Sequence, residues 1–232
     1  MSVRRLHLAI PDDAVPAVTA AVHDPDGPAV TNVLLAPGAG GDLDGAPMVA
    51  LAGALAAEGH RVVRVNLPYR EAGRAGAPRA ERSVPGYRAI LEAARAELDP
   101  HGRWISGGKS YGGRVATMAV AEGMEVAGLI LYGYPMHAPG KPDRLRVGHW
   151  PEVDAPCLFL QGTRDTFGSV QLLEEHRRLL PRRSTVHVVE GGDHSLHVTG
   201  KAAPDGRPRK AEQVVADLGP VVSRWIDDLA ER

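Results

Sequence analysis

The sequence has one cysteine, few aromatic residues and almost no net charge. Cys157 has no partner for a disulfide within the chain, and it stands in the apolar run CLFL, so we expect a buried thiol and a reducing compartment. Lys and Arg total 27 against 28 Asp and Glu, which gives a formal net charge of -1. A balanced charge gives no general attraction to nucleic acid or to an anionic membrane surface, so neither is expected as a partner.

Long hydrophobic runs are also missing. No run reaches the roughly 18 apolar residues that indicate a membrane-spanning helix. The first residues, MSVRRLHLAIPDD, reach a proline and two aspartates before any apolar stretch of signal-peptide length. The sequence therefore predicts a cytoplasmic protein. Residues 1–232 show no repeat or linker and are expected to form one domain. Nothing in the sequence indicates an oligomeric state.

Predicted strands and helices alternate along most of the chain. Two segments at the start, separated by a Pro and Asp cluster, are expected to pair antiparallel. The expected strands are 3–9, 17–23, 33–36, 61–68, 103–108, 126–132, 156–160 and 185–189, and the expected helices are 46–58, 85–98, 114–123, 169–180 and 211–230. Residues 69–83, rich in Gly and Arg, are predicted to be a long surface loop. This alternation predicts an α/β fold with a mostly parallel central sheet and helices on both faces.

The strongest local signal is a G-x-S-x-G motif, residues 108–112, between a predicted strand and a predicted helix. A nucleophile on a sharp strand-to-helix turn needs small neighbours, which the glycines supply. The amides at the start of the following helix can stabilise a developing oxyanion, and we expect Tyr111 N–H to be one donor. Ser110 is therefore the predicted nucleophile.

A serine nucleophile needs a histidine within hydrogen-bond reach and a carboxylate behind it. Asp165 and His194 each follow the C-terminal end of a predicted parallel strand, where α/β sheets place their sites. The order Ser, Asp, His is that of α/β-hydrolases. We predict that His194 is the general base and that Asp165 orients it, with Asp143 and Asp154 as alternative carboxylates.

The glycine-rich loop after the first central strand, PGAGGD, is expected to supply the second oxyanion donor. Ala39 N–H is the first candidate and Gly40 N–H the second, because glycines let the backbone approach a substrate carbonyl closely. The connection between the strands ending at 132 and starting at 156 is too short for a large lid domain. We therefore expect an open site for a small acyl substrate. The residues expected to line it are Gly40, Tyr69, Lys109, Tyr134 and Met136, with ordinary packing as an equal alternative for the aromatics.

The sequence does not fit the common cofactor and metal motifs. The tripeptide GKS at 108–110 is not a phosphate-binding loop, because Arg103 stands where its first glycine is needed. The earlier glycine-rich loop lacks the dinucleotide fingerprint, since Leu43 occupies the third glycine position. His194 and His197 have no third ligand motif beside them. The sequence predicts no cofactor and no metal.

Six segments together resemble a known family: APGAGGD, NLPYREAGR, GGKSYGGR, GYPMHAPGKPDRL, LQGTRDTFG and GGDHSL. They are similar to the KANL3/Tex30-type α/β-hydrolase-like family, which is related to dienelactone hydrolases. The resemblance implies the α/β-hydrolase fold and a triad of Ser110, Asp165 and His194. It also implies a second class of function, because some relatives are parts of protein complexes.

The residues and the resemblance together predict a serine hydrolase that cleaves a small ester, thioester or lactone through an acyl-enzyme. The alternative is a catalytically silent module of the same fold that binds a protein or a small ligand.

Overall fold

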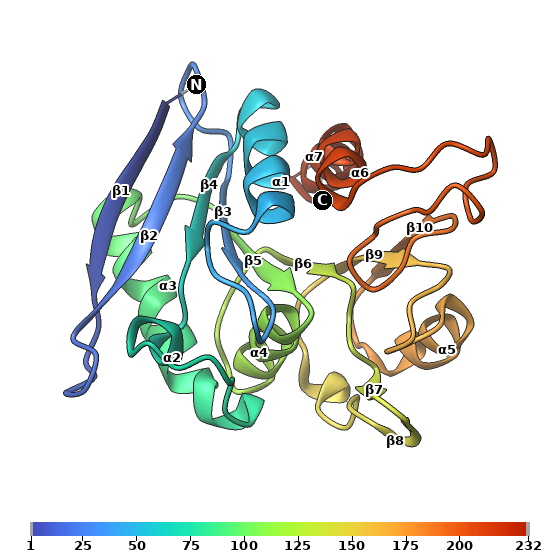
Figure 1. Cartoon of the computed structure of the whole chain (residues 1–232). Coiled ribbons are helices and arrows are strands. Elements are labelled where there is room, and N and C mark those ends of the chain that lie inside the picture. The colour runs from blue at the N-terminus through green and yellow to red at the C-terminus, as the bar shows by residue number, and fades with distance from the viewer. Residues whose placement is uncertain (1, 231–232) are drawn as a thin grey trace.

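An eight-stranded sheet organises the chain, of which the computed structural model describes residues 2–230 (Figure 1). The strand order is β1-β2-β4-β3-β5-β6-β9-β10. The strands are β1 (Ser2–Ala9), β2 (Ala17–Asp24), β3 (Asn32–Ala36), β4 (Arg61–Val65), β5 (Trp104–Lys109), β6 (Gly128–Tyr132), β9 (Cys157–Gly162) and β10 (Ser184–Val189). β1 pairs antiparallel with β2, and β2 with β4, while all other neighbours are parallel. The predicted opening pair and the mostly parallel sheet are both confirmed.

Helices cover both faces of this sheet. Helices α1 (Ala46–Ala57), α6 (Ala211–Asp217) and α7 (Gly219–Ala230) lie on one face, and α3 (Val84–Leu98) and α4 (Tyr111–Ala121) lie on the other (Figure 1). Strand β3 contributes apolar side chains to the cores on both faces of the sheet. Val33 and Leu35 belong to the apolar cluster under α1, whereas Leu34 and Ala36 belong to the cluster under α3 and α4. Because successive strand residues point to opposite faces, an uninterrupted apolar run is needed here.

Three predicted segments differ from the structure. Strand β4 ends at Val65 because Pro68 begins the short helix α2 (Pro68–Glu71). The segment predicted to be a surface loop contains α2 and a 3₁₀ turn, η1 (Ala80–Ser83), and it buries the side chain of Tyr69. The last predicted helix is divided into α6 and α7 next to Pro220, whose missing N–H prevents a continuous helix.

The connection between β6 and β9 carries a small hairpin, β7 (His137–Ala138) with β8 (Lys141–Leu145), and a 3₁₀ turn, η2 (Trp150–Glu152). None of these elements was predicted from the sequence. Within residues 2–230 this connection contains no lid domain, as its length predicted. The helix predicted at 169–180 is α5 (Val170–His176), extended by η3 (Arg177–Leu179).

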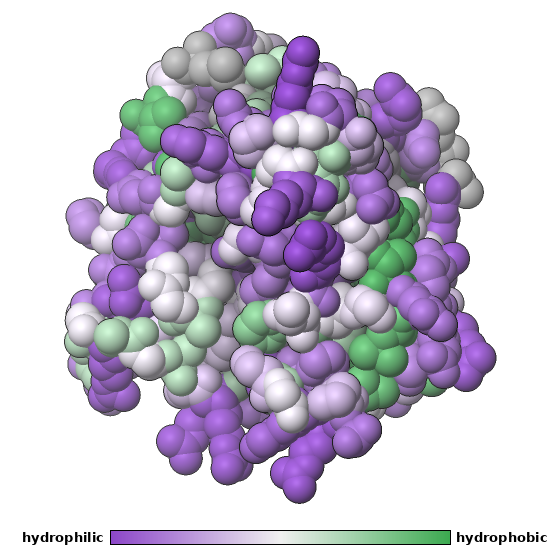
Figure 2. All heavy atoms as spheres, turned by 45° about the vertical axis from the view of Figure 1, so that its right-hand side comes forward, coloured by the Kyte–Doolittle hydropathy of each residue, from purple (hydrophilic) through white to green (hydrophobic). Residues whose placement is uncertain are grey.

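The face shown in Figure 2 is mainly hydrophilic, with a narrow band of hydrophobic residues on its right and smaller hydrophobic spots elsewhere. Most apolar side chains lie instead in the two clusters that sandwich the sheet. Of the helices in the described part of the chain, none is both long and apolar enough to cross a bilayer.

Candidate active site

Ser110 occupies the turn between β5 and α4 in an unusual backbone conformation. Its φ of 48° and ψ of -107° lie outside the regions that residues with a side chain ordinarily adopt. The turn is held in place because Ser110 N–H donates to the Tyr132 carbonyl at 2.8 Å and the Ser110 carbonyl accepts from Arg114 N–H at 3.0 Å. Strain of this kind persists only where the surrounding structure fixes it, and it is common at functional sites.

The glycines of the motif let the end of β3 approach this turn. A Cβ added at Gly108 would lie 2.1 Å from the Ala36 carbonyl oxygen, and one at Gly112 would lie 2.4 Å from the same atom. Both distances are far shorter than a van der Waals contact. The sequence pattern therefore has a steric cause, which is the close approach of β3 to both sides of Ser110.

Ser110, His194 and Asp165 come together at the carboxyl edge of the sheet. His194 Nε2 lies 2.8 Å from Ser110 Oγ, and His194 Nδ1 lies 2.8 Å and 3.0 Å from the two oxygens of Asp165. Asp154, one of the alternative carboxylates, instead pairs with Arg182. The three side chains thus form two linked hydrogen bonds, in which an imidazole lies between a hydroxyl and a carboxylate. Such a chain can take a proton from the hydroxyl.

The Asp165 carboxylate is fully buried and accepts two further hydrogen bonds. Its Oδ1 accepts from Phe167 N–H at 2.8 Å, and its Oδ2 accepts from Gln161 Nε2 at 2.8 Å. The Phe167 ring stacks on the imidazole of His194, with the ring centroids 4.1 Å apart. These contacts fix the orientation of the carboxylate and of the imidazole.

Sequence reasoning missed Gln161. This buried residue also donates to the Gly168 carbonyl at 2.8 Å and accepts from Tyr134 N–H at 3.0 Å, so it links the ends of β6 and β9 to Asp165. The signal was present in the strand CLFLQG, because a polar residue inside a buried apolar strand must find hydrogen-bond partners.

The loop after β3 brings Ala39 beside Ser110. Tyr69 Oη donates to the Ala39 carbonyl at 2.8 Å, and burial raises the pKa of Tyr69 to about 12, so the phenol keeps the proton it donates. Tyr69 therefore holds the loop that carries Ala39, a role different from the substrate contact that the sequence predicted. The Tyr111 amide is at the first position of α4, where an N–H has no partner within the helix.

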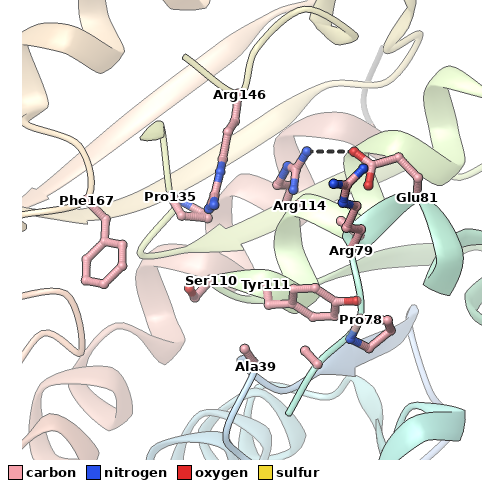
Figure 3. A pocket seen from close by; sticks show the side chains of 12 residues that line it. Ala39, Pro78, Arg79, Glu81, Ser110, Tyr111, Arg114, Pro135, Arg146 and Phe167 are labelled. Atoms are coloured by element: carbon pink, nitrogen blue, oxygen red, sulfur yellow. Dashed lines mark hydrogen bonds and ion pairs between the residues drawn. The ribbon is translucent and has the colours of Figure 1, made fainter. Parts of the chain in front are cut away.

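Two cavities meet at Ser110. The first has a volume of about 530 Å³ and the second about 400 Å³, and both are lined by Ala39, Ser110 and Phe167. Tyr111 lines only the first, which Figure 3 shows from close by. His194 lines only the second. A bound molecule that reaches Ser110 can therefore extend in two directions.

Gly40 and Lys109 were predicted to line the substrate pocket, and both line the second cavity. The Lys109 ammonium donates to Ser195 Oγ at 2.7 Å and lies 5.7 Å from the centre of the Tyr132 ring. Burial lowers the pKa of Lys109, against the opposing effect of nearby Asp193. The amine of Lys109 is thus already hydrogen-bonded to Ser195 at the edge of the second cavity.

Tyr134 and Met136 are not brought to this site. Both side chains are fully buried, and neither lines a cavity beside Ser110. Tyr134 packs edge-on against Trp150 with ring centroids 5.4 Å apart, and its hydroxyl accepts from Trp150 Nε1 at 3.1 Å. The prediction is corrected because these two side chains turn into the core, while Pro135 between them faces the first cavity.

No group of three His, Cys, Asp or Glu side chains is placed to hold a metal ion within residues 2–230. His197, which neighbours His194 in sequence, is exposed and lies 3.9 Å from Asp193.

A parallel sheet wrapped by helices, with a serine on a strained strand-to-helix turn, defines the α/β-hydrolase fold. A family model described as an alpha/beta hydrolase domain matches residues 29–222, which is most of the chain. The chain belongs to this family, and its membership supports hydrolase activity.

Solved structures with the same fold span nearly the whole chain. The chain is similar to a lidless serine hydrolase from Xanthomonas campestris, with 23% identity, a TM-score of 0.71 and coverage of 97% of this chain and 95% of the other. It is similar to a dienelactone hydrolase from Anabaena variabilis, with 16% identity, a TM-score of 0.73 and coverage of 98% and 97%. Est1E from Butyrivibrio proteoclasticus, solved with ferulic acid bound, shares 14% identity and a TM-score of 0.74, with coverage of 98% and 100%.

Proposed function

We propose that this protein is a serine hydrolase that cleaves a small ester, thioester or lactone through an acyl-enzyme intermediate. The observation that carries the proposal is the continuous hydrogen-bonded chain from Ser110 Oγ through His194 to the buried Asp165 carboxylate. The resemblance to KANL3/Tex30-type proteins and the dienelactone hydrolase neighbour are compatible with it.

In the first half of the proposed reaction, His194 Nε2 accepts the proton of Ser110 Oγ as this oxygen attacks the acyl carbonyl carbon. Asp165 stabilises the imidazolium that forms. The carbonyl oxygen becomes an oxyanion that accepts hydrogen bonds from the amides of Ala39 and Tyr111. His194 then gives its proton to the leaving oxygen or sulfur, and the bond between that atom and the acyl carbon breaks.

In the second half, water enters on the side that the leaving group has vacated. His194 takes a proton from this water, whose oxygen attacks the acyl carbon, and then returns the proton to Ser110 Oγ as the acid departs. Since His194 lines only the second cavity, the leaving group and the water belong there, and the acyl chain belongs in the first cavity.

The dimensions of the site favour small substrates. The two cavities are open to the surface, their sizes suit a ligand of a few hundred Å³, and no lid covers them in residues 2–230. The Est1E neighbour was solved with a small molecule, ferulic acid, bound to it. All three candidate classes, ester, thioester and lactone, present the same electrophilic carbonyl to Ser110.

Labelling with a fluorophosphonate, followed by mass spectrometry of peptides, tests the proposal. The wild-type protein is expected to gain one adduct on the peptide that contains Ser110, and Ser110→Ala is expected to gain none, because only an activated serine attacks the phosphorus at a useful rate. Turnover of short 4-nitrophenyl esters is expected to fall to the background rate in the same variant.

The control is Ser169→Ala, which removes an exposed serine at the start of α5 and is expected to keep the adduct. Equal labelling of wild type and Ser110→Ala would contradict the proposal. A wild-type protein that is folded, unlabelled and inactive on esters, thioesters and lactones would favour the silent binding module instead.

A further inference from the structure

Three arginines line the first cavity, and they come from three separate parts of the chain. Arg79 precedes η1, Arg114 lies in the first turns of α4, and Arg146 follows β8. Figure 3 shows all three along one side of the cavity, with Ser110 and Tyr111 on the opposite side. We call these three residues the arginine wall.

The arginine wall carries more charge than the protein neutralises. Arg114 pairs with Glu81 at 3.1 Å. In the described part of the chain, no carboxylate forms an ion pair with Arg79 or Arg146. Glu81 is also the only acidic residue among those that line the cavity. The lining therefore holds three positive charges against one negative charge.

The uncompensated charge is partly removed from water. The side chain of Arg146 is half-buried, and burial together with the neighbouring Arg114 lowers the pKa of Arg146. Arg114 Nε is buried and has no hydrogen-bond partner among the described residues. Gathering like charges costs free energy in the unliganded protein, and leaving a buried donor unpaired adds to that cost. An anionic ligand in the cavity relieves the repulsion between the gathered charges.

Guanidinium groups suit carboxylates, because their planar array of donors matches the two carboxylate oxygens. The proposed reaction places the acyl chain, and not the leaving group, in this cavity. We therefore propose that the arginine wall binds a carboxylate at the far end of the acyl group, so that the preferred substrates are half-esters or half-thioesters of dicarboxylic acids. This inference rests on the proposed function.

A matched pair of substrates tests it. Mono(4-nitrophenyl) adipate and 4-nitrophenyl hexanoate have the same leaving group and acyl chain length, and they differ in a terminal carboxylate against a methyl group. The wild-type protein is expected to have a kcat/KM at least about tenfold higher for the adipate ester, because hydrogen bonds to charged groups are worth roughly that much or more. The preference is expected to weaken as salt is added.

Variants of the arginine wall are compared by the ratio of the two kcat/KM values. Arg146→Gln and the exposed Arg79→Gln are each expected to lower this ratio by about tenfold, and Arg146→Glu is expected to invert it. The matched control is Arg144→Gln, an exposed arginine on β8 outside the cavity, which is expected to leave the ratio unchanged. A similar fall in this control would assign the effect to general surface charge and overturn the inference.

A binding measurement separates this inference from the proposed function. Calorimetric titration of the Ser110→Ala protein is expected to show that monomethyl adipate binds at least about tenfold more tightly than methyl hexanoate, and that Arg146→Gln in the same background removes the difference. If the wild-type protein takes no fluorophosphonate label and hydrolyses no ester, thioester or lactone, the proposed function fails and the calorimetry alone decides whether the arginine wall binds carboxylates. Hydrolysis without a preference for the adipate ester, or equal binding of the two probes, overturns the arginine-wall inference and leaves the proposed function intact.

Discussion

At the scale of single residues, Gln161 ties the carboxylate of the proposed triad to the ends of two strands. Its amide group is shared among the Asp165 carboxylate, the Gly168 carbonyl and the Tyr134 amide, all of them buried. None of these partners can turn to water if the glutamine is lost, so each would remain buried without its hydrogen bond.

Replacing Gln161 by leucine is expected to lower the free energy of unfolding by about 2–4 kcal/mol, because each buried partner left unsatisfied costs roughly 1–3 kcal/mol and the three share one network. Under the proposed function, kcat for ester hydrolysis is expected to fall by at least about tenfold, since Asp165 loses one of the contacts that orient it. Urea unfolding and steady-state kinetics measure the two effects.

Gln171→Leu is the control for this change. It alters an exposed glutamine at the start of α5 and is expected to shift the free energy of unfolding by less than about 0.5 kcal/mol. If Gln161→Leu proved as stable and as active as this control, the hydrogen bonds assigned to Gln161 would have no energetic importance.

At the scale of elements, the contact between the end of β3 and the start of α4 determines where the loop that carries Ala39 lies. Gly112 lies in the first turn of α4, and a Cβ at this position would overlap the backbone of residues 36 and 37. By contrast Gly53, inside α1, has no atom within 4 Å of its Cβ position. The two helical glycines thus provide a matched comparison of a required and an unrequired glycine.

Gly112→Ala is expected to destabilise the protein by roughly 2 kcal/mol or more and to lower the proposed hydrolase activity, because the added methyl group must push β3 and the Ala39 loop away from Ser110. Gly53→Ala is expected to raise the free energy of unfolding by about 0.5–1 kcal/mol, since alanine is the better helix former. Thermal unfolding of both variants measures the difference. A Gly112→Ala protein that matched Gly53→Ala in stability would show that β3 moves aside without cost.

The elements that could be predicted from sequence are those with a strong apolar pattern. Strands such as β6 and β9 are buried on both faces and show as short uninterrupted apolar runs. The hairpin formed by β7 and β8 was missed because Lys141–Leu145 is an exposed, polar strand without such a pattern. The break between α6 and α7 was missed although Pro220 marks it, because both halves continue the same apolar face.

The residues of the candidate site likewise fall into those that could be predicted from the sequence and those that could not. The positions of Ser110, Asp165 and His194 follow from their places at strand ends, which topology brings to one edge of a parallel sheet. Which residues of a loop turn inward depends on packing, so Tyr134 and Met136 were misplaced. The arginine wall left no sequence signal because its members are separated along the chain and meet only in the folded protein.

At the scale of the whole molecule, burial lowers the pKa of four histidines, His23, His60, His149 and His187, and the shift is large for His23 and His149. His23 is buried and accepts a hydrogen bond from Arg64 Nε at 3.0 Å, and burial together with this arginine lowers the pKa of His23 to about 4. Burial, aided by the charge of Arg114, lowers the pKa of His149 to about 4, and His149 Nε2 lies 2.8 Å from Thr117 Oγ1.

The free energy of unfolding is therefore expected to fall as the pH is lowered from about 6.5 to about 4. In this range the unfolded chain binds a proton at each imidazole and the folded protein does not, so acid favours unfolding, whereas above about 6.5 both states are neutral at these positions. Urea unfolding at several pH values measures the slope. His149→Gln is expected to reduce the proton uptake on unfolding by up to about one proton.

His101→Gln, which changes an exposed histidine after α3, serves as the control and is expected to keep the wild-type slope. A wild-type stability that stayed constant between these pH values would refute the assignment of neutral imidazoles to the folded protein.

The solitary thiol has a practical consequence for studying this molecule. Cys157 is fully buried in β9, and burial raises the pKa of its thiol to about 12, so it is both inaccessible and protonated near neutral pH. A maleimide reagent is expected to leave the folded wild-type protein unmodified. A cysteine introduced at an exposed position near the rim of either cavity would then carry a fluorophore or spin label alone, and ligand entry could be followed spectroscopically without first removing a native reactive group.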